Sequence, residues 1–83
     1  MYYIYVLRSL KNNKRYVGYT SKDPKIRLHE HNTGSNIFTS RNSPYLLIHS
    51  EALETKTDAI KREKYLKSGN GRKFLDQINN KPM

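Results

Sequence analysis

The fold is decided by Tyr2-Tyr3-Ile4-Tyr5-Val6-Leu7 and by the second segment Arg15-Tyr16-Val17-Gly18-Tyr19. Aromatic and β-branched residues dominate both segments, and such residues favour extended strands. Asn12-Asn13 lies between them and tolerates a left-handed backbone, so it predicts a hairpin turn. Alternation along the first strand puts its odd-numbered side chains on one face and Ile4 and Val6 on the other.

Two helices are predicted from their start signals. Asp23-Pro24 offers a capping side chain and a residue suited to the first helical position, so a helix should run to His31 or Asn32, with Gly34 as its stop. Thr55 and Asp58 resemble a capping box and predict a second helix as far as Lys67.

The remaining segments complete the order of elements. Residues 34–43 are loop-like, and Tyr45–His49 follows Pro44 as a third strand. Ser68–Gly71 should interrupt the chain before a short last helix with Phe74, Leu75 and Ile78 on one side. The order β-β-α-β-α-α predicts an α+β fold, a three-stranded, mostly antiparallel sheet flanked by helices, in one domain over residues 1–83.

Composition narrows the function. The 83 residues include 16 Lys or Arg but only 7 Asp or Glu, a net charge of +9 that favours a nucleic-acid partner, although solubility alone would also explain it. Cysteine is absent, which excludes disulfides and thiolate zinc sites. No apolar run approaches the ~18–20 residues of a membrane span, and no secretory signal is evident, so we expect a cytoplasmic protein that does not enter membranes.

Several residues fit poorly with a purely structural role. Gly18 weakens a strand and often marks the close approach of a ligand or another backbone. Arg27 and His31 are four residues apart, which places a cation that can bind phosphate beside an imidazole that can move a proton; a solvated helix face is the alternative. Glu63 falls within the apolar stripe of its helix, where it is either a ligand for Mg²⁺ or the partner of Lys67.

The sequence lacks the motifs of several other classes of catalytic and metal-binding protein. The sequence has no paired-carboxylate motif for a two-metal nuclease, no phosphate-binding glycine loop, and no zinc pattern among His29, His31 and His49.

Tyr3-Ile4-Tyr5 and Tyr16-Val17-Gly18, followed by Arg27, His31 and Glu63, resemble the GIY-YIG endonuclease superfamily, in particular its small stand-alone members. The resemblance extends over nearly all of the chain. It implies that the catalytic residues are Tyr5, Tyr16, Arg27, His31 and Glu63. Two departures are evident: Tyr3 replaces the leading glycine of the motif, and Tyr19 stands where some relatives have a lysine.

The resemblance also implies a mechanism, the metal-assisted hydrolysis of a phosphodiester bond. Glu63 would hold one Mg²⁺ or Mn²⁺ ion, and Arg27 would stabilise the charge that develops on the phosphate. A tyrosine would activate the attacking water. A free tyrosine has a pKa of about 10, so as a base it needs help from Arg27, the metal or His31. We favour Tyr5 as this base and Tyr16 as its neighbour and phosphate ligand, but neither the resemblance nor the sequence decides between them.

DNA is the expected partner, and a role in DNA repair or recombination is the expected context. The residues expected to contact the phosphate backbone are Lys11, Lys14, Lys22, Lys25, Arg41, Arg72 and Lys73. Without a base-reading element, cleavage should be weakly specific or directed by DNA structure, or should depend on a protein partner for specificity. The oligomeric state is left open. The alternative function is a nucleic-acid-binding module of the same fold with little or no turnover.

Overall fold

The computed structural model of the chain describes residues 1–34 and 40–78. The elements in chain order are β1 (Tyr2–Ser9), β2 (Arg15–Thr20), α1 (Pro24–Asn32), the short 3-10 helix η1 (Ser40–Asn42), β3 (Tyr45–Leu53), α2 (Lys56–Lys67) and α3 (Gly69–Ile78). This order confirms the predicted α+β fold.

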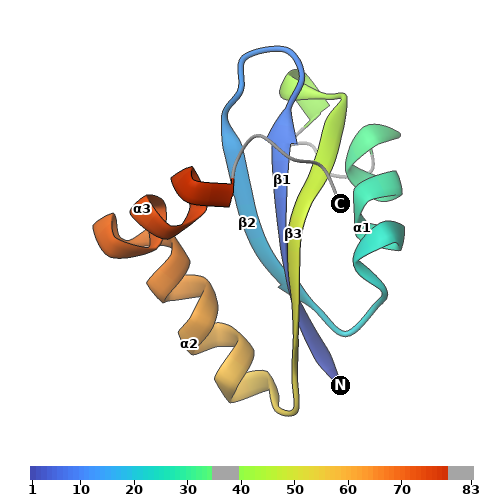
Figure 1. Cartoon of the computed structure of the whole chain (residues 1–83). Helices are drawn as coiled ribbons and strands as arrows, with labels where there is room; N and C mark the ends of the chain where they lie inside the picture. Colours follow the sequence, from blue (N-terminus) through green and yellow to red (C-terminus); the bar gives the residue numbers. More distant parts are fainter. Residues whose placement is uncertain (35–39, 79–83) are drawn as a thin grey trace.

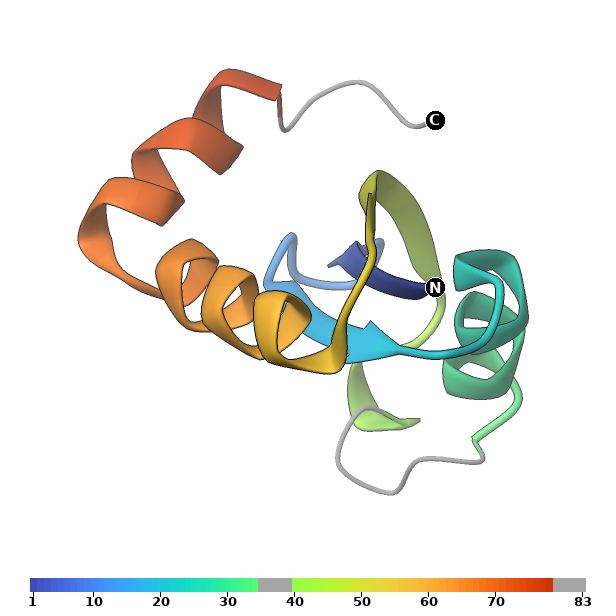
Figure 2. The ribbon, with the colours of Figure 1, turned by 90° about the horizontal axis from the view of Figure 1, so that it is seen from below.

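The three strands form one antiparallel sheet in the order β2-β1-β3, so β1 is central (Figure 1). The helices cover both faces of the sheet. Figure 2 shows α1 on one face and α2 and α3 on the other. Because β1 is covered from both sides, Ile4, Tyr5, Val6 and Leu7 are all at most 1% exposed.

A membrane span would need a much longer apolar helix than any found in the described ranges.

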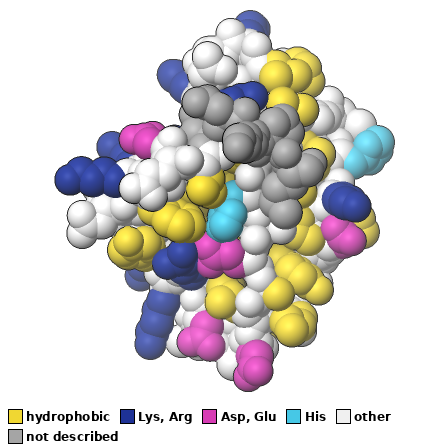
Figure 3. All heavy atoms as spheres, viewed as in Figure 1, with side chains coloured by type: hydrophobic (Ala, Val, Ile, Leu, Met, Phe, Trp, Pro, Cys, Tyr) yellow, Lys and Arg dark blue, Asp and Glu magenta, His cyan; other side chains and the backbone are white. Residues whose placement is uncertain are grey.

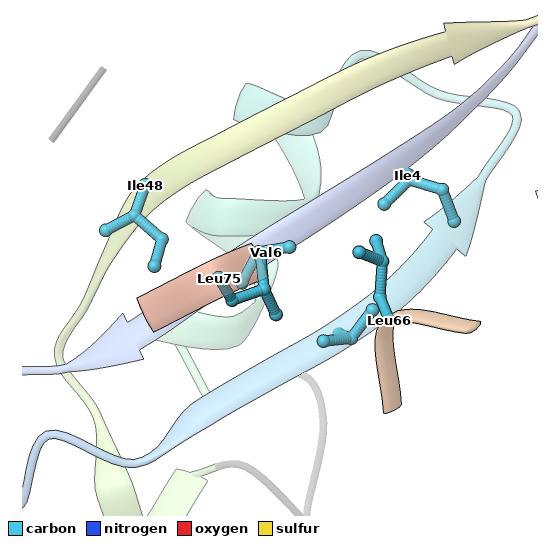
Figure 4. Close-up of a cluster of buried hydrophobic side chains, with 6 residues drawn as sticks. Ile4, Val6, Ile48, Leu66 and Leu75 are labelled. Carbon is cyan, nitrogen blue, oxygen red and sulfur yellow. The ribbon is translucent and has the colours of Figure 1, made fainter. Parts of the chain in front are cut away.

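The face beneath α2 and α3 holds an aliphatic core. Ile4 and Val6 of β1 meet Ile48 of β3, Leu66 of α2 and Leu75 of α3 there (Figure 4). The opposite face, beneath α1, has a smaller cluster of Tyr5, Leu7 and Tyr45, against which Tyr16, Leu28 and Leu47 pack. The predicted alternation along β1 is therefore confirmed. It gives one face of the sheet an aliphatic core and the other a cluster rich in tyrosine.

The strands are longer than the sequence predicted. β1 continues to Ser9 and β3 continues to Leu53, because these strands pair from Tyr2–Leu53 to Ser9–Tyr45. Register along β3 shifts at a bulge between the partners of Val6 and Leu7. The added ends of both strands contain polar residues, so the pattern of hydrophobic residues did not predict them.

The predicted turn and helix caps are confirmed. Asn13 has a positive φ of 62°, the left-handed backbone expected in the hairpin. The Asp23 carboxylate accepts a hydrogen bond from Lys25 N, and Thr55 Oγ1 accepts one from Asp58 N. Gly34 has a φ of 81° just after α1. Of the predicted loop at 34–43, residues 35–39 lie outside the described residues, and η1 occupies its end.

The predicted break at Ser68–Gly71 is wrong in extent. Ser68 alone separates the helices, and α3 begins at Gly69. The tight corner depends on Gly71, where an added Cβ would lie 2.4 Å from Leu66 Cα. Glycine here permits close contact between two helices rather than ending one of them.

Candidate active site

Tyr5 is the centre of a polar cluster on the α1 face of the sheet. Its hydroxyl lies 3.1 Å from His31 Nε2 and accepts a hydrogen bond from Arg27 Nη2 at 3.4 Å. Both partners project from α1, one turn apart, toward the central strand. The predicted Arg27–His31 pair therefore faces a buried tyrosine, and the alternative of a solvated helix face is wrong for His31, which is fully buried.

Gly18 makes room for the Tyr5 ring. The two residues face each other across β1 and β2, and a Cβ on Gly18 would lie 2.6 Å from the Tyr5 hydroxyl oxygen. The expected close approach is confirmed, but the neighbour is a side chain of the cluster rather than a ligand or another backbone. Glycine at this position lets the phenol lie flat along the sheet and reach α1.

Tyr16 joins the same cluster from β2. Its ring centroid lies 4.9 Å from that of His31 and 6.1 Å from that of Tyr5. Tyr45 of β3 closes the other side, with its ring centroid 6.2 Å from that of His31. Three tyrosines from three strands thus surround one imidazole.

Glu30 is a residue of this site that the sequence prediction missed. Its Oε1 accepts a hydrogen bond from Arg27 Nη1 at 2.6 Å, and its Oε2 pairs with Lys22 Nζ at 3.0 Å. These two cations lower the pKa of the Glu30 carboxyl group. Glu30 follows Arg27 by three positions on a helix, a spacing at which side chains meet, so the pairing was visible in the sequence.

The protonation states of the cluster follow from burial. Removal from water, followed by the nearby Arg27 charge, lowers the pKa of His31 from 6.5, so the imidazole is neutral at neutral pH. Burial also raises the pKa of Tyr5 to about 12, despite the hydrogen bond from Arg27, so this phenol is protonated. With Arg27 donating to the Tyr5 oxygen, the phenol proton is free to point at the neutral imidazole.

Glu63 lies apart from this group, on α2. Its side chain is 19% exposed, and Lys67 Nζ approaches its Oε1 at 3.7 Å. Ala59 and Leu66, its neighbours in the stripe, are buried. The predicted half-buried position is confirmed, and the alternative partner, Lys67, is present at a long distance. The structure joins Tyr5, Tyr16, Arg27 and His31 directly, whereas the recorded ion pair of Glu63 is with its own helix.

Glu63 is the half-buried acid of the described residues that is held least tightly by cations. Three half-buried acids occur in the described part of the chain: Glu30, Glu51 and Glu63. Glu30 and Glu51 are each held by two basic side chains at 2.6–3.0 Å, whereas Glu63 has a single lysine at 3.7 Å. Mg²⁺ commonly binds one or two protein carboxylates and otherwise water and phosphate. No group of three potential ligands occurs within 1–34 and 40–78.

A second polar network on the α2 and α3 face was also missed. Arg62 forms a two-bond pair with Glu51 at 2.8 and 3.0 Å, and His49 Nε2 lies 2.7 Å from the same carboxylate. The Arg62 guanidinium also stacks over the ring of Phe74, 5.4 Å from its centroid. This network ties β3 to both helices and fixes the helix that carries Glu63.

The predicted phosphate-contacting residues are spread over several elements. Lys11 and Lys14 lie in or beside the hairpin, Lys25 starts α1, and Arg72 and Lys73 are exposed on α3. Lys22 is neutralised by Glu30, and Lys11 Nζ donates to the carbonyl oxygen of Arg41. Figure 3 shows one face of the molecule, where Lys and Arg side chains are more frequent over α2 and α3 than over α1.

This geometry agrees with the family comparisons. The model of the GIY-YIG catalytic domain matches residues 1–76, which include both tyrosine motifs and all three helices almost to their end. The chain belongs to the GIY-YIG family. GIY-YIG domains are nuclease domains, and nucleases of this family generally use divalent metals.

Similar proteins include UPF0213 proteins from bacteria and an archaeon. The protein of Staphylococcus saprophyticus is 35% identical over 78 residues, 93% of each chain, and that of Staphylococcus aureus strain Mu3 is 32% identical over the same shares. That of Haloquadratum walsbyi is 34% identical over 68 residues, 81% of this chain and 74% of its own. No solved structure matches the chain significantly.

Proposed function

We propose that the protein is a metal-dependent endonuclease that hydrolyses phosphodiester bonds in DNA. The observation that carries this proposal is the hydrogen-bonded group of Arg27, Tyr5 and His31, in a chain of a nuclease family. A permanent cation, a buried phenol and a neutral imidazole are together able to bind a phosphate and remove a proton from water.

Arg27 is the phosphate-binding residue of this proposal. Glu30 holds Nη1, which orients the guanidinium while Nη2 reaches toward Tyr5. A planar guanidinium donates two parallel hydrogen bonds to phosphate oxygens, and these bonds strengthen as negative charge grows in the transition state. Lysine presents a point charge and cannot reproduce this geometry.

Tyr5 acts as a proton relay rather than as a stored phenolate, because its pKa is raised to about 12. As water attacks the phosphorus atom, the bond from phosphorus to the leaving oxygen breaks, and the leaving alkoxide takes a proton from solvent. The water proton passes to the Tyr5 oxygen while the phenol proton passes to His31 Nε2. The neutral imidazole is the final acceptor, and its lowered pKa keeps it uncharged, with one nitrogen able to accept, at neutral pH. Tyr16 borders the same space and contributes a phosphate contact.

Glu63 is the residue that would hold the Mg²⁺ or Mn²⁺ ion. The bound ion would supply Lewis acidity to a phosphate oxygen. The protein part of this function is the half-buried carboxylate on α2, a helix that the Arg62–Glu51 pair attaches to β3.

Selectivity would come from DNA structure. The chain has no recognised base-reading motif, and exposed lysines contact backbone phosphates without reading sequence. We place such an activity in DNA repair or recombination, where branched DNA arises, with a protein partner supplying further specificity.

The decisive experiment compares nicking of supercoiled plasmid and cleavage of branched DNA in Mg²⁺, in Mn²⁺ and in EDTA. Glu63→Ala should abolish metal-dependent cleavage while DNA binding is kept. Glu54→Ala is the matched control, because Glu54 is an exposed acid just before α2. Equal rates for wild type and Glu63→Ala would refute the metal role. DNA binding without cleavage of any substrate by the wild type would favour the binding module instead.

A further inference from the structure

A pocket of about 370 Å³ opens between β2 and the corner formed by α2 and α3. Its apolar lining is Val17 of β2, Leu66 of α2 and Leu75 of α3, all of which belong to the aliphatic core and are at most 7% exposed. Figure 1 shows this corner beside β2, which is an edge strand of the sheet. The pocket thus has a rigid floor, fixed by the core of the protein.

Cations line the same pocket, and no acidic side chain does. Lys14, Lys67 and Arg72 lie around it, together with Arg15. Arg15 is paired with Asp76 at 2.7 Å, whereas the ion pair of Lys67 with Glu63 is longer, at 3.7 Å. An apolar floor surrounded by positive charge is complementary to a ligand with a flat apolar part and attached phosphates.

Tyr16 lies between the pocket and the candidate active site. It lines the pocket as part of the edge strand β2, whereas its ring belongs to the cluster on the α1 face, 4.9 Å from the ring of His31. The pocket floor belongs to the aliphatic core on the opposite face, so β2 separates the two sites. A DNA strand bound at both sites would pass around this edge of the sheet.

We propose that this pocket binds one unpaired nucleotide of the DNA substrate. This inference rests on the proposed function and names its substrate class. The volume lies at the small end of the range for ligand pockets, about 300–1,000 Å³, which suits a single nucleotide rather than a stacked run. A nucleotide in a duplex cannot enter, because its base is stacked and paired. Gapped, flapped or branched DNA offers such a nucleotide.

Titration of the isotope-labelled protein followed by NMR tests the pocket directly. The probe is thymidine 3′,5′-bisphosphate, with inorganic phosphate as the comparison, and both are added in EDTA. The methyl signals of Val17, Leu66 and Leu75 should shift and saturate with the nucleotide but not with phosphate. Unchanged methyl signals, or equal shifts with phosphate, would overturn the proposal.

A pair of neighbouring variants tests the substrate preference. Arg72 lines the pocket, whereas Lys73 is exposed beside it and does not. Affinity is measured in EDTA for a blunt DNA duplex and for the same duplex with one unpaired nucleotide. Arg72→Gln should weaken binding of the second DNA by about threefold more than that of the first, as expected for loss of one exposed charge contact. Lys73→Gln should weaken both alike.

Equal effects of Arg72→Gln on the two DNAs would contradict the pocket. These measurements need no turnover, so they separate the two proposals. Nucleotide-dependent methyl shifts without any cleavage would support nucleotide binding in the pocket and refute the nuclease activity. Cleavage without those shifts would support the nuclease activity and refute nucleotide binding in the pocket.

Discussion

The two faces of the sheet share one central strand but differ in chemistry. Ile4 and Val6 point into the aliphatic core under α2 and α3, whereas Tyr5 points into a group of tyrosines, histidine and arginine under α1. Neighbouring residues of β1 therefore belong in turn to the aliphatic core and to the candidate active site. The aliphatic core fixes the position of β1. The opposite face can therefore bury polar side chains such as Tyr5 and His31, which contribute less to stability than aliphatic side chains do.

The helices reflect the same division. α1 contributes little apolar surface, and its Ile26 is 50% exposed. It is attached by polar contacts instead: Asn32 Oδ1 accepts from Tyr45 N at 2.6 Å, and Asn32 Nδ2 donates to Tyr45 O at 3.1 Å. α2 and α3 instead bury Ala59, Leu66 and Leu75. The face that carries the cluster of Tyr5, Arg27 and His31 is thus held by fewer buried apolar side chains than the face covered by α2 and α3.

The largest expected effect is on stability, at the aliphatic face. Leu66→Ala should lower the free energy of unfolding by about 2–5 kcal/mol, because Leu66 is 1% exposed and the cavity cannot fully collapse. Urea unfolding followed by circular dichroism measures it. Ile4→Val, expected to cost about 0.5–1.5 kcal/mol, keeps the test open if Leu66→Ala does not fold. A change below about 1 kcal/mol for Leu66→Ala, or below about 0.5 kcal/mol for Ile4→Val where the first variant does not fold, would contradict the assigned core.

The next effect is on catalysis, at the polar face. Arg27→Lys should reduce the rate of DNA cleavage by about 10²-fold, because lysine keeps the charge but loses the two-bond phosphate contact and the bond to Tyr5. The free energy of unfolding should change by less than about 1 kcal/mol, since Arg27 is partly exposed. Single-turnover kinetics and urea unfolding give the two values. A rate near that of the wild type would remove Arg27 from catalysis.

The fold was predictable because the first strands and the caps carry local signals. Tyr2–Leu7, Asn13 and Thr55 each behave as their side chains require. The extension of β3 from His49 to Leu53 was not predictable, because the polar residue Glu51 within it has its partner, Arg62, on a later helix. Local propensity contains no information about such a partner.

The candidate site was predictable as a set of residues but not as a geometry. The spacing of Arg27 and His31 indicated a shared helix face, and the structure adds that this face meets Tyr5. Burial, which raises the pKa of Tyr5 to about 12 and changes its proposed role from base to relay, depends on the whole fold. The position of Glu63 within a stripe was likewise evident, whereas its weak pairing with Lys67 was not.

A smaller effect is expected at the corner that joins α2 and α3. Gly71→Ala should destabilise the protein by about 1–3 kcal/mol, because the new methyl group would lie against the backbone of Leu66, which cannot move freely. Gly69→Ala is the matched control, since nothing lies within 4 Å of its added Cβ, and it should be neutral or slightly stabilising. Thermal unfolding distinguishes them. Equal melting temperatures for the two variants would show that the corner is not tightly packed.

The smallest effect is expected from pH and involves His31. Its pKa in the folded protein lies below 6.5, its ordinary value, because burial and Arg27 disfavour the charged ring. The unfolded chain therefore binds more protons, so this contribution to stability is complete above about pH 6.5 and is lost as pH falls below that value. The Glu30 and Glu51 carboxyl groups, whose pKa values are lowered, contribute in the same direction only below about pH 4.5.

Urea unfolding between about pH 7 and pH 5 therefore isolates the imidazole. Stability of the wild type should fall across this range, and His31→Gln should flatten the dependence. His29→Gln, at an exposed position of the same helix, should leave it unchanged. If His31→Gln kept the full slope, the imidazole would bind its proton equally in the folded and unfolded protein, and burial would not lower its pKa. This measurement thus tests whether burial on the polar face prepares the base, or only fills space as burial does on the aliphatic face.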